Sequence, residues 1–296
     1  MIKGVRVMPN WSTNVLRIEK LNDKGEEPQD IINAICENEE LDFNKIIPMP
    51  KVLDVPSGTT GDIAFRAYMF RNKENITEQQ MNVVRNNVRE YILENIRNAT
   101  EESVQHDIEN MCSYKEDKYN TEEKIMELGK QLFDNVQTYG SLDWYEWCVK
   151  NWGTKWNADT LSVSDDEIIF NTAWSPSEPI IKELSRMYPN NAFYFKYAEE
   201  QVGAYAGKGT FINGTSEDWV DYERESKELY ELAFEILGWG EDYAYCEEIG
   251  TYAYIDRDSE DRDVFVINEQ KYTREEFDNK WEWNGCLETY TLREDK

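Results

Sequence analysis

The chain has 296 residues, with 60 Asp and Glu against 32 Lys and Arg, and a net charge of −28. Its length is sufficient for one large domain or two ordinary ones, and a hydrophobic content of 40% argues against a disordered chain. A charge of this size repels a phosphate backbone, which argues against direct binding of nucleic acid. It attracts a basic surface on another protein, and such an association weakens as the salt concentration rises. The same charge also favours solubility.

The cellular compartment is indicated by the first residues and by the cysteines. No apolar stretch follows the first six residues, so no signal peptide is predicted, and no run approaches the roughly 18 apolar residues of a membrane helix. The five cysteines are far apart and include no CxxC pair, which is typical of reduced thiols. The sequence therefore predicts a cytoplasmic protein.

The N-terminal segment predicts a strand followed by a helix. Residues 14–21 alternate apolar and charged side chains, as in a strand with one buried face. Pro28 suits the first turn of a helix that carries Ile31, Ile32 and Ile35 on one face. The chain is then expected to be extended up to Pro50, because residues before proline avoid the helical region.

A helical region is predicted next. Its helices are expected over residues 76–108, 122–136 and 142–152. Thr77 and Gln80 form a capping box at the start of the first helix, and Gly153 ends the last one. Because no strand pattern lies between these helices, residues 58–140 are expected to form a helical insertion.

The central part of the chain returns to strand patterns. Residues 161–164 and 168–174 predict a strand pair around the turn at Asp165 and Asp166. Pro179 opens a helix, and a hairpin about Gly203 is expected from the strand patterns at its two sides, over residues 192–197 and 205–212.

The composition changes after Gly214. Residues 214–296 hold 25 acidic and 9 basic side chains, so about −16 of the total charge lies in this last quarter. An amphipathic helix is expected over residues 219–237, followed by strands at 251–255 and 264–267 and a short helix capped by Thr273. We predict that residues 215–296 form a small acidic α+β module.

Three segments invite a chemical interpretation, and each departs from the motif that it approaches. His106 is the one histidine, and it lies in a polar stretch without a nucleophile turn nearby. Residues 203–210 approach a phosphate-binding loop, but Gly209 stands where Ser or Thr is needed. Residues 256–263 have the carboxylate density of a calcium loop, but Asp261 stands where glycine is required. We therefore predict no enzymatic activity, cofactor or metal.

Four segments, in this order, carry a resemblance to a known family. They are residues 8–18 (MPNWSTNVLRI), 42–50 (DFNKIIPMP), 147–158 (WCVKNWGTKWNA) and 170–176 (FNTAWSP). With them the chain resembles the YubB-like proteins of plasmids and phages. The matching motif positions include Asn10, Trp11, Asn14, Trp152, Gly153, Trp156, Thr172, Trp174 and Pro176.

The resemblance implies an α+β fold with a ferredoxin-like core formed by residues 1–57 and 141–214. Ser12 stands where family members usually have Cys, so no function is expected from a thiol at this position. The family supplies no catalytic residues. In size and acidic character the chain is also similar to the phage inhibitor of the Gabija defence system.

The resulting functional hypothesis is a phage protein that binds a host defence nuclease complex and blocks its access to DNA. The residues expected to face the basic surface of this partner are Asp218, Trp219, Asp221, Tyr222, Glu225 and Glu228. The alternatives are a DNA mimic, a nucleotide-binding or enzymatic ferredoxin-like domain, and a plasmid or phage housekeeping protein. The many aromatic side chains are also compatible with a homo-oligomer.

Overall fold

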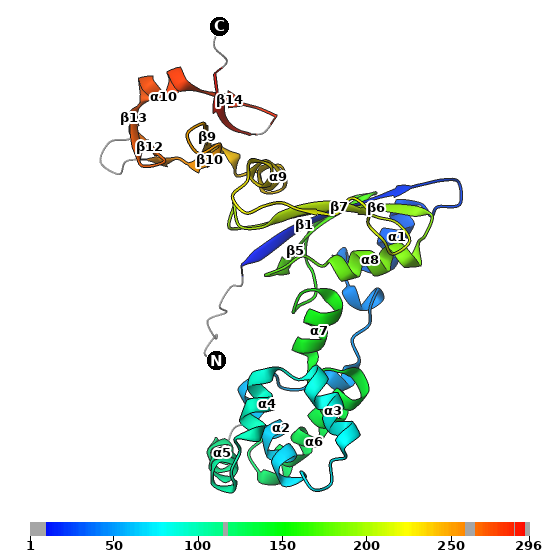
Figure 1. Ribbon diagram of the computed structural model, residues 1–296. Helices are drawn as coiled ribbons and strands as arrows, with labels where there is room; N and C mark the ends of the chain where they lie inside the picture. Colours follow the sequence, from blue (N-terminus) through cyan, green and yellow to red (C-terminus); the bar gives the residue numbers. More distant parts are fainter. Residues whose placement is uncertain (1–9, 115–117, 258–263, 287, 294–296) are drawn as a thin grey trace. The chain divides into compact units, whose positions relative to one another are not determined.

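The computed structural model describes residues 10–114, 118–257, 264–286 and 288–293 (Figure 1). The chain forms two compact units. One unit, called here the sheet unit, comprises residues 1–46 and 157–296, and the other, called the helical unit, comprises residues 47–156. The helical unit contains the whole of the predicted insertion, and the acidic C-terminal residues belong to the sheet unit.

A six-stranded sheet is the centre of the sheet unit. Its strands are β1 (Trp11–Lys20), β4 (Asp159–Val163), β5 (Glu167–Ala173), β6 (Asn191–Glu199), β7 (Ala206–Phe211) and β8 (Val220–Asp221). They lie in the order β4-β5-β1-β6-β7-β8, and every neighbouring pair is antiparallel. The predicted hairpins at Asp165 and Asp166 and at Gly203 are confirmed as the β4–β5 and β6–β7 turns.

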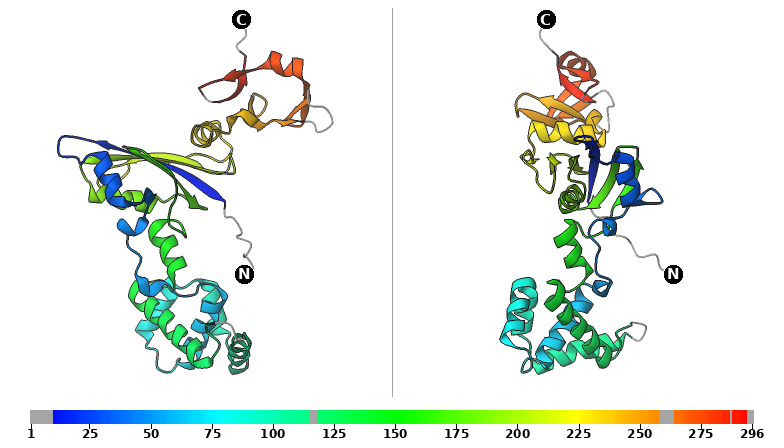
Figure 2. Two further views of the ribbon diagram at one scale, coloured as in Figure 1. Left: turned by 180° about the vertical axis from the view of Figure 1, so that it is seen from behind. Right: turned by 90° about the vertical axis from the view of Figure 1, so that its right-hand side faces the viewer.

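Two helices cover one face of this sheet, namely α1 (Pro28–Ile35) and α8 (Glu178–Met187) (Figure 1 and Figure 2). Each helix begins with a proline in its first turn, as predicted, and buries its apolar stripe. Leu16, Ile18 and Phe193 are fully buried in the sheet. Full burial of such a side chain contributes about 1.5–3 kcal/mol. The alternation of apolar and polar side chains in β1 and the apolar stripes of α1 and α8 therefore determine which face of the sheet these helices cover.

The order of elements gives the sheet unit its topology. β1, α1, β4, β5, α8 and β6 follow one another, and β1 and β6 are the neighbouring strands in the middle of the sheet. The helical unit is inserted between α1 and β4. Two short strands, β2 (Cys36–Glu37) and β3 (Glu40–Leu41), and a 3-10 turn over Phe43–Lys45 follow α1.

The opposite face of the sheet carries α9 (Lys227–Leu237), which lies across it (Figure 1). Leu229, Leu232 and Ala233 pack on the small side chains of Ala198 and Ala206. The predicted helix over residues 219–237 is therefore wrong in its first half, where the chain forms β8 and then an irregular connection. The helix begins after Ser226, whose side chain accepts a hydrogen bond from the Leu229 backbone N–H at 3.2 Å.

Tertiary contacts explain why the first half of that segment is not helical. The Trp219 ring lies almost parallel to the rings of Phe195 and Tyr197, at centroid distances of 6.2 and 6.1 Å. It also covers Gly209 of β7, where an added Cβ would come within 2.9 Å of the indole. These contacts require an extended path, and Glu225 then has a φ of 61°, which is incompatible with a continuous right-handed helix.

The helical unit has six α-helices and a 3-10 turn (Lys51–Leu53) within its described residues. The α-helices are α2 (Thr59–Arg71), α3 (Glu78–Asn87), α4 (Glu90–Arg97), α5 (Glu101–Ser113), α6 (Glu122–Tyr139) and α7 (Trp144–Trp152). Their core includes Phe65, Val84, Ile92, Ile125 and Leu132. The helices α2 and α6 approach so closely that a Cβ at Gly129 would come within 2.2 Å of the Ala64 carbonyl oxygen.

The predicted single helix over residues 76–108 is wrong, because this segment forms α3, α4 and α5. Val88 is extended, with a ψ of 139°, and Thr100 caps a new helix. The two breaks let Val84, Ile92 and Val104 all enter one core, which a straight helix of this length could not arrange. The capping box of Thr77 and Gln80 and the left-handed Gly153 are confirmed.

The C-terminal part of the sheet unit is built from short elements. They are β9 (Tyr243–Cys246), β10 (Thr251–Tyr254), β11 (Asp256–Arg257), β12 (Val264–Ile267), β13 (Gln270–Thr273), α10 (Arg274–Lys280), β14 (Trp281–Asn284) and β15 (Thr289–Leu292). Phe265, Phe277 and Trp281 are buried at its centre. The predicted strands and the Thr273 cap are confirmed, while the acidic turn over residues 258–263 lies outside the described residues.

Within the described part of the chain, no helix is both long and apolar enough to cross a membrane.

Candidate partner-binding surface

The outward face of α9 carries a stripe of carboxylates. Glu228, Glu231 and Glu235 are spaced by three and four residues, so they lie one above the other on the helix. Leu229 and Ala233 face the sheet on the other side of the same helix, and Leu232 lies between the two sides. The amphipathic pattern that fixes α9 on the sheet therefore also determines that the three glutamates point away from the core.

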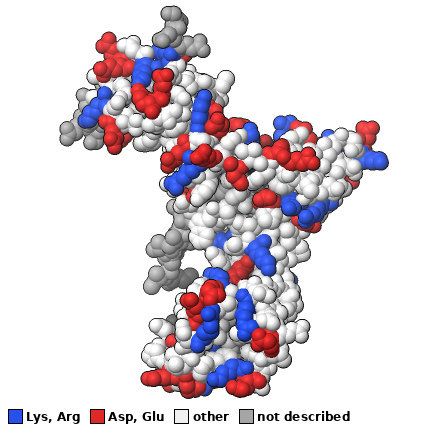
Figure 3. Space-filling view, in the orientation of Figure 1, with Lys and Arg blue, Asp and Glu red and all other residues white. Residues whose placement is uncertain are grey.

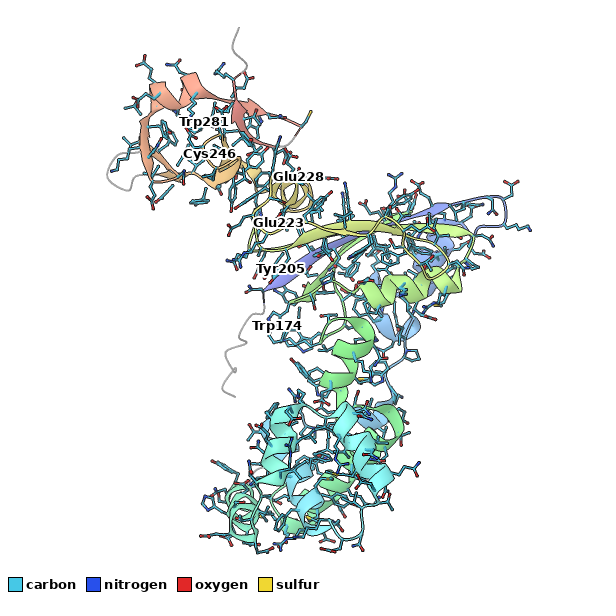
Figure 4. The ribbon with its side chains drawn as sticks, viewed as in Figure 1. Trp174, Tyr205, Glu223, Glu228, Cys246 and Trp281 are labelled. Carbon is cyan, nitrogen blue, oxygen red and sulfur yellow. The ribbon has the colours of Figure 1, made fainter. Side chains whose placement is uncertain are left out.

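These glutamates line a hollow of about 330 Å³. Tyr222 and Leu232 contribute its apolar surface, and Lys208 and Cys286 complete it. We call this site the acidic hollow. It brings together Tyr222 and Glu228, which were both predicted to face a partner, with Glu231 and Glu235, which were not (Figure 4 labels Glu228).

The three carboxylates of the acidic hollow differ in how far they are already engaged. Glu235 pairs with Lys196 at 2.7 Å. Glu231 accepts a hydrogen bond from the Tyr252 hydroxyl at 3.1 Å and lies 3.6 Å from the Lys227 ammonium. Burial, and then the charge of Glu231, raise the pKa of Tyr252, so this phenol stays a donor. Glu228 has no ion pair or hydrogen bond with any other described side chain, and it is exposed.

The other predicted partner-binding residues lie elsewhere in the connection between β7 and α9. Asp218 accepts hydrogen bonds from the Thr210 backbone N–H and hydroxyl, both at 2.7 Å. These donors, the backbone N–H foremost, lower the pKa of Asp218. Asp221 accepts from the Tyr197 hydroxyl at 2.8 Å and from the Trp219 indole N–H at 3.0 Å. Both carboxylates thus hold the connection to the sheet.

Trp219 and Glu225 complete the predicted set. The Trp219 ring is half-buried between the connection and the sheet, so it completes the core below β6 and β7. Glu225 is exposed and lies 3.7 Å from the guanidinium of its neighbour Arg224. The structure brings neither of them into the acidic hollow, whose lining is formed by other residues.

Acidic side chains are distributed over much of the surface seen in Figure 3, with basic side chains between them. The sheet unit holds 42 acidic and 19 basic residues, and the helical unit holds 18 and 13. The net charges are therefore −23 and −5. The acidic field that could attract a basic partner comes mainly from the unit that contains the acidic hollow.

The predicted motif residues that lie in the sheet have structural roles. Asn14 is fully buried, and its side-chain amide donates to the backbone oxygen of Ser12 at 2.8 Å and to the hydroxyl of Thr172 at 2.8 Å. The Thr172 hydroxyl in turn donates to the Ser175 carbonyl at 2.7 Å. These bonds connect β1 and β5 and fix the turn that follows, where Pro176 precedes α8.

The motif residues at the end of the same sheet are more exposed. The Asn10 amide donates to Glu199 at 2.9 Å, and its backbone oxygen accepts from the Trp174 N–H at 2.9 Å. Trp174 is 52% exposed and has a φ of 71°, and Trp11 is half-buried on the neighbouring strand (Figure 4 labels Trp174).

The remaining motif residues belong to the helical unit. The Trp152 indole N–H donates to the Ile47 carbonyl at 2.8 Å, and its ring meets Trp147 edge-on. Gly153 ends α7 in the left-handed region, and the Lys155 ammonium lies 3.9 Å from the centre of the Trp156 ring. The hydrogen bond from Trp152 to Ile47 joins the last helix of the unit to its first residue.

The segments considered for catalysis or metal binding have simpler surroundings. His106 is exposed on α5, and its ring lies 3.1 Å from the Asn110 amide. Residues 203–210 form the β6–β7 turn and most of β7, and of residues 256–263 only the first two are described. Among the described residues, no three His, Cys, Asp or Glu side chains are grouped so that they could hold a metal ion.

Comparison with known proteins supports the fold. Residues 151–239 match a family model described as the ferredoxin-like domain in Api92-like protein. The predicted ferredoxin-like domain, with a helical region before it, is thus confirmed. A crystal structure of the protein api92 from Yersinia pseudotuberculosis is similar at a TM-score of 0.33 and 11% identity, over 73% of this chain and 98% of that one. No curated protein matches the chain.

Sequence reasoning missed Glu231 and Glu235 as members of the site. The signal was present, because their spacing from Glu228 predicts a common helix face. It was overlooked because the helix was predicted to start too early in the chain. Asp218 and Asp221 were therefore predicted to bind a partner as Glu228 does, although both accept hydrogen bonds that hold them to the sheet.

Proposed function

We propose that this chain is a non-enzymatic binding protein whose acidic hollow receives a basic side chain of a protein partner. The observation that carries the proposal is the stripe of Glu228, Glu231 and Glu235 beside the apolar surfaces of Tyr222 and Leu232. A guanidinium donates to carboxylates in fixed directions while its stem packs on apolar surface, so arginine fits this combination best. The −23 charge of the sheet unit speeds the encounter.

We further propose that the partner is a host defence complex with nuclease activity and that the chain is a phage product acting in the host cytoplasm. The support is the set of YubB-like motifs, which are typical of plasmid and phage proteins, and the similarity in size and acidic character to the inhibitor of the Gabija system. Binding would cover the basic surface through which such a nuclease approaches DNA.

The test is an affinity capture from a bacterial host with the full chain as bait, followed by washes of rising salt. A nuclease or defence subunit retained in a fixed ratio and released as salt rises is the expected result. The captured protein is then purified, and its affinity is measured for the natural chain and for Glu228→Lys. We expect this reversal to weaken binding about tenfold, since a close charge pair across an interface is lost.

Glu94→Lys is the matched control, because it changes the net charge equally on an exposed position of the helical unit. Equal weakening by both variants would show that only the net charge matters. If neither variant changes the affinity, the acidic hollow is not the binding site.

A DNA mimic is the second candidate, and the same stripe supports it. Residues three and four apart on a helix have Cβ atoms about 5–6 Å from one another, so glutamates at this spacing form a row of negative charge that resembles a phosphate backbone. Excess duplex DNA should then displace the chain from its partner. Retention of the complex in excess duplex DNA favours binding outside the nucleic-acid site.

A further inference from the structure

A second hollow, separate from the acidic one, lies within the helical unit. It is formed where the end of α3, the turn between α6 and α7, and α7 itself meet, and its volume is about 420 Å³. Its lining includes Asn87, Arg89, Ser141, Tyr145, Glu146 and Lys150. This volume lies in the range of small-molecule binding sites, and every lining residue belongs to one compact unit.

Ser141 gives the first sign that this hollow takes a ligand. The residue is only 1% exposed, and its hydroxyl oxygen has no hydrogen-bond partner among the described residues. Its neighbours are satisfied, since the Leu142 N–H donates to Glu146 at 3.2 Å and Asp143 accepts from the Glu146 N–H at 3.2 Å. A buried hydroxyl without a partner is unfavourable, so it is normally retained where something else binds it.

The charges of the hollow favour an anion. Lys150 has no ion pair with any described carboxylate, and its ammonium would lie 3.4 Å from a Cβ at Gly140, directly over the turn that holds Ser141. The Arg89 Nε lies 2.8 Å from Glu146, and its charge also acts on Asp62 and Asp143, but the two terminal amino groups of the guanidinium have no hydrogen bond within the described residues.

Glu146 does not cancel this attraction. Its side chain is only 12% exposed, its Oε2 accepts from the Leu142 N–H, and its Oε1 lies 2.8 Å from the Arg89 Nε in an ion pair without the geometry of a hydrogen bond. The helical unit itself is close to neutral for its size, at −5.

We propose that this hollow binds a small molecule through an oxyanion, a phosphate or a carboxylate, held by Lys150, Arg89 and the Ser141 hydroxyl. Charge-assisted donors from three directions suit such a group. Tyr145 and the half-exposed Val149 offer apolar surface for the remainder of the molecule. The site goes beyond the proposed function, because neither its residues nor its ligand takes part in the acidic hollow.

The test is calorimetric titration of the full chain with inorganic phosphate, acetate and adenosine monophosphate. We expect saturable binding of at least one, which identifies the oxyanion. Lys150→Gln should weaken it about tenfold or more, since a charged hydrogen bond is lost. Lys73→Gln, an exposed position of the same unit, removes the same charge and should leave the affinity unchanged.

Ser141→Ala separates a binding role from a structural one. Because its hydroxyl is unpartnered in the free protein, we expect this variant to melt no earlier than the natural chain, yet to bind the anion several-fold more weakly. Tyr145→Leu should weaken adenosine monophosphate and spare inorganic phosphate. The proposal is overturned if none of the three probes binds saturably up to millimolar concentrations, or if Lys150→Gln or Ser141→Ala leaves the affinity unchanged.

Discussion

The sheet unit and the helical unit handle charge in different ways. The sheet unit carries a net charge of −23, and on α9 the exposed Glu228 has no ion pair with any described cation. The helical unit carries −5, and ion pairs join Arg66 to Asp107, Arg71 to Glu101 and Arg89 to Glu146. Solubility alone would require no such division, so the difference supports a binding role for the acidic surface.

The two units also differ in how they are built. The helical unit packs helices that are close in sequence, whereas the sheet unit pairs β1 with β5 and β6 across more than a hundred residues. The strands of the ferredoxin-like sheet can therefore pair only if the inserted helical unit folds without preventing β1 from meeting β5 and β6. Such an arrangement works when each unit has its own core, as both do here.

The largest expected effect tests whether the two cores are independent. Phe65→Ala removes a fully buried ring from the helical unit and should lower its stability by about 3–5 kcal/mol. Phe170→Ala is the matching change in the sheet unit. Hydrogen exchange should show loss of protection confined to the unit that carries the substitution. Uniform loss over both units in either variant would contradict independent cores.

A pH effect is expected in the helical unit. Asp143 caps α7 through the Glu146 N–H, and burial raises its pKa to about 6. The folded protein then binds more protons than the unfolded chain between pH about 4 and 6, so stability falls as the pH rises through this window. Arg89 and Glu146 are the neighbouring charges.

Asp143→Asn keeps a capping oxygen and removes the ionisable group. We expect the variant to be more stable than the natural chain above pH 6, by about 1 kcal/mol or more, and to lose the slope between pH 4 and 6. Denaturant unfolding at a series of pH values measures both quantities. An unchanged slope in this variant would assign the pH dependence to another group.

The start of α9 offers a smaller effect in the sheet unit. Ser226→Ala removes the side-chain oxygen that accepts from the Leu229 N–H, at an expected cost of about 1 kcal/mol. Because α9 also carries the acidic hollow, partner affinity should fall with it. Ser226→Asp restores a capping oxygen and should recover stability, which separates the cap from the loss of a small side chain.

The smallest expected effect contrasts stability with binding. Glu228 stands three residues from Glu231 on α9, and such like charges repel by about 0.2–0.5 kcal/mol, whereas the dipole of the helix stabilises a carboxylate in its first turn by about 0.3–1 kcal/mol. Because the two effects oppose each other, Glu228→Gln should change the melting temperature very little while it weakens partner binding. Weaker binding at an unchanged melting temperature would mark this carboxylate as retained for binding. A lowered melting temperature would show that Glu228 stabilises the fold.

Local patterns in the sequence were sufficient for much of the fold. The alternation in residues 14–21 predicts β1, Pro28 and Pro179 predict the first turns of two helices, and Thr77 and Thr273 predict caps. Each depends on side-chain periodicity or on a bond within four residues, which the chain carries wherever it lies. The ordered motifs added the ferredoxin-like topology, which no local pattern contains.

Only the tertiary structure decided the breaks between α3, α4 and α5, the late start of α9, and which carboxylates accept hydrogen bonds from the rest of the protein. The stripe of residues 76–108 continues through Val88, but the core is reached only if the chain bends there. Asp218 and Glu228 are alike in the sequence, yet one accepts bonds from β7 and the other is open to a partner. Their difference arises from residues that are distant along the chain, and hydrophobic periodicity carries no information about such contacts.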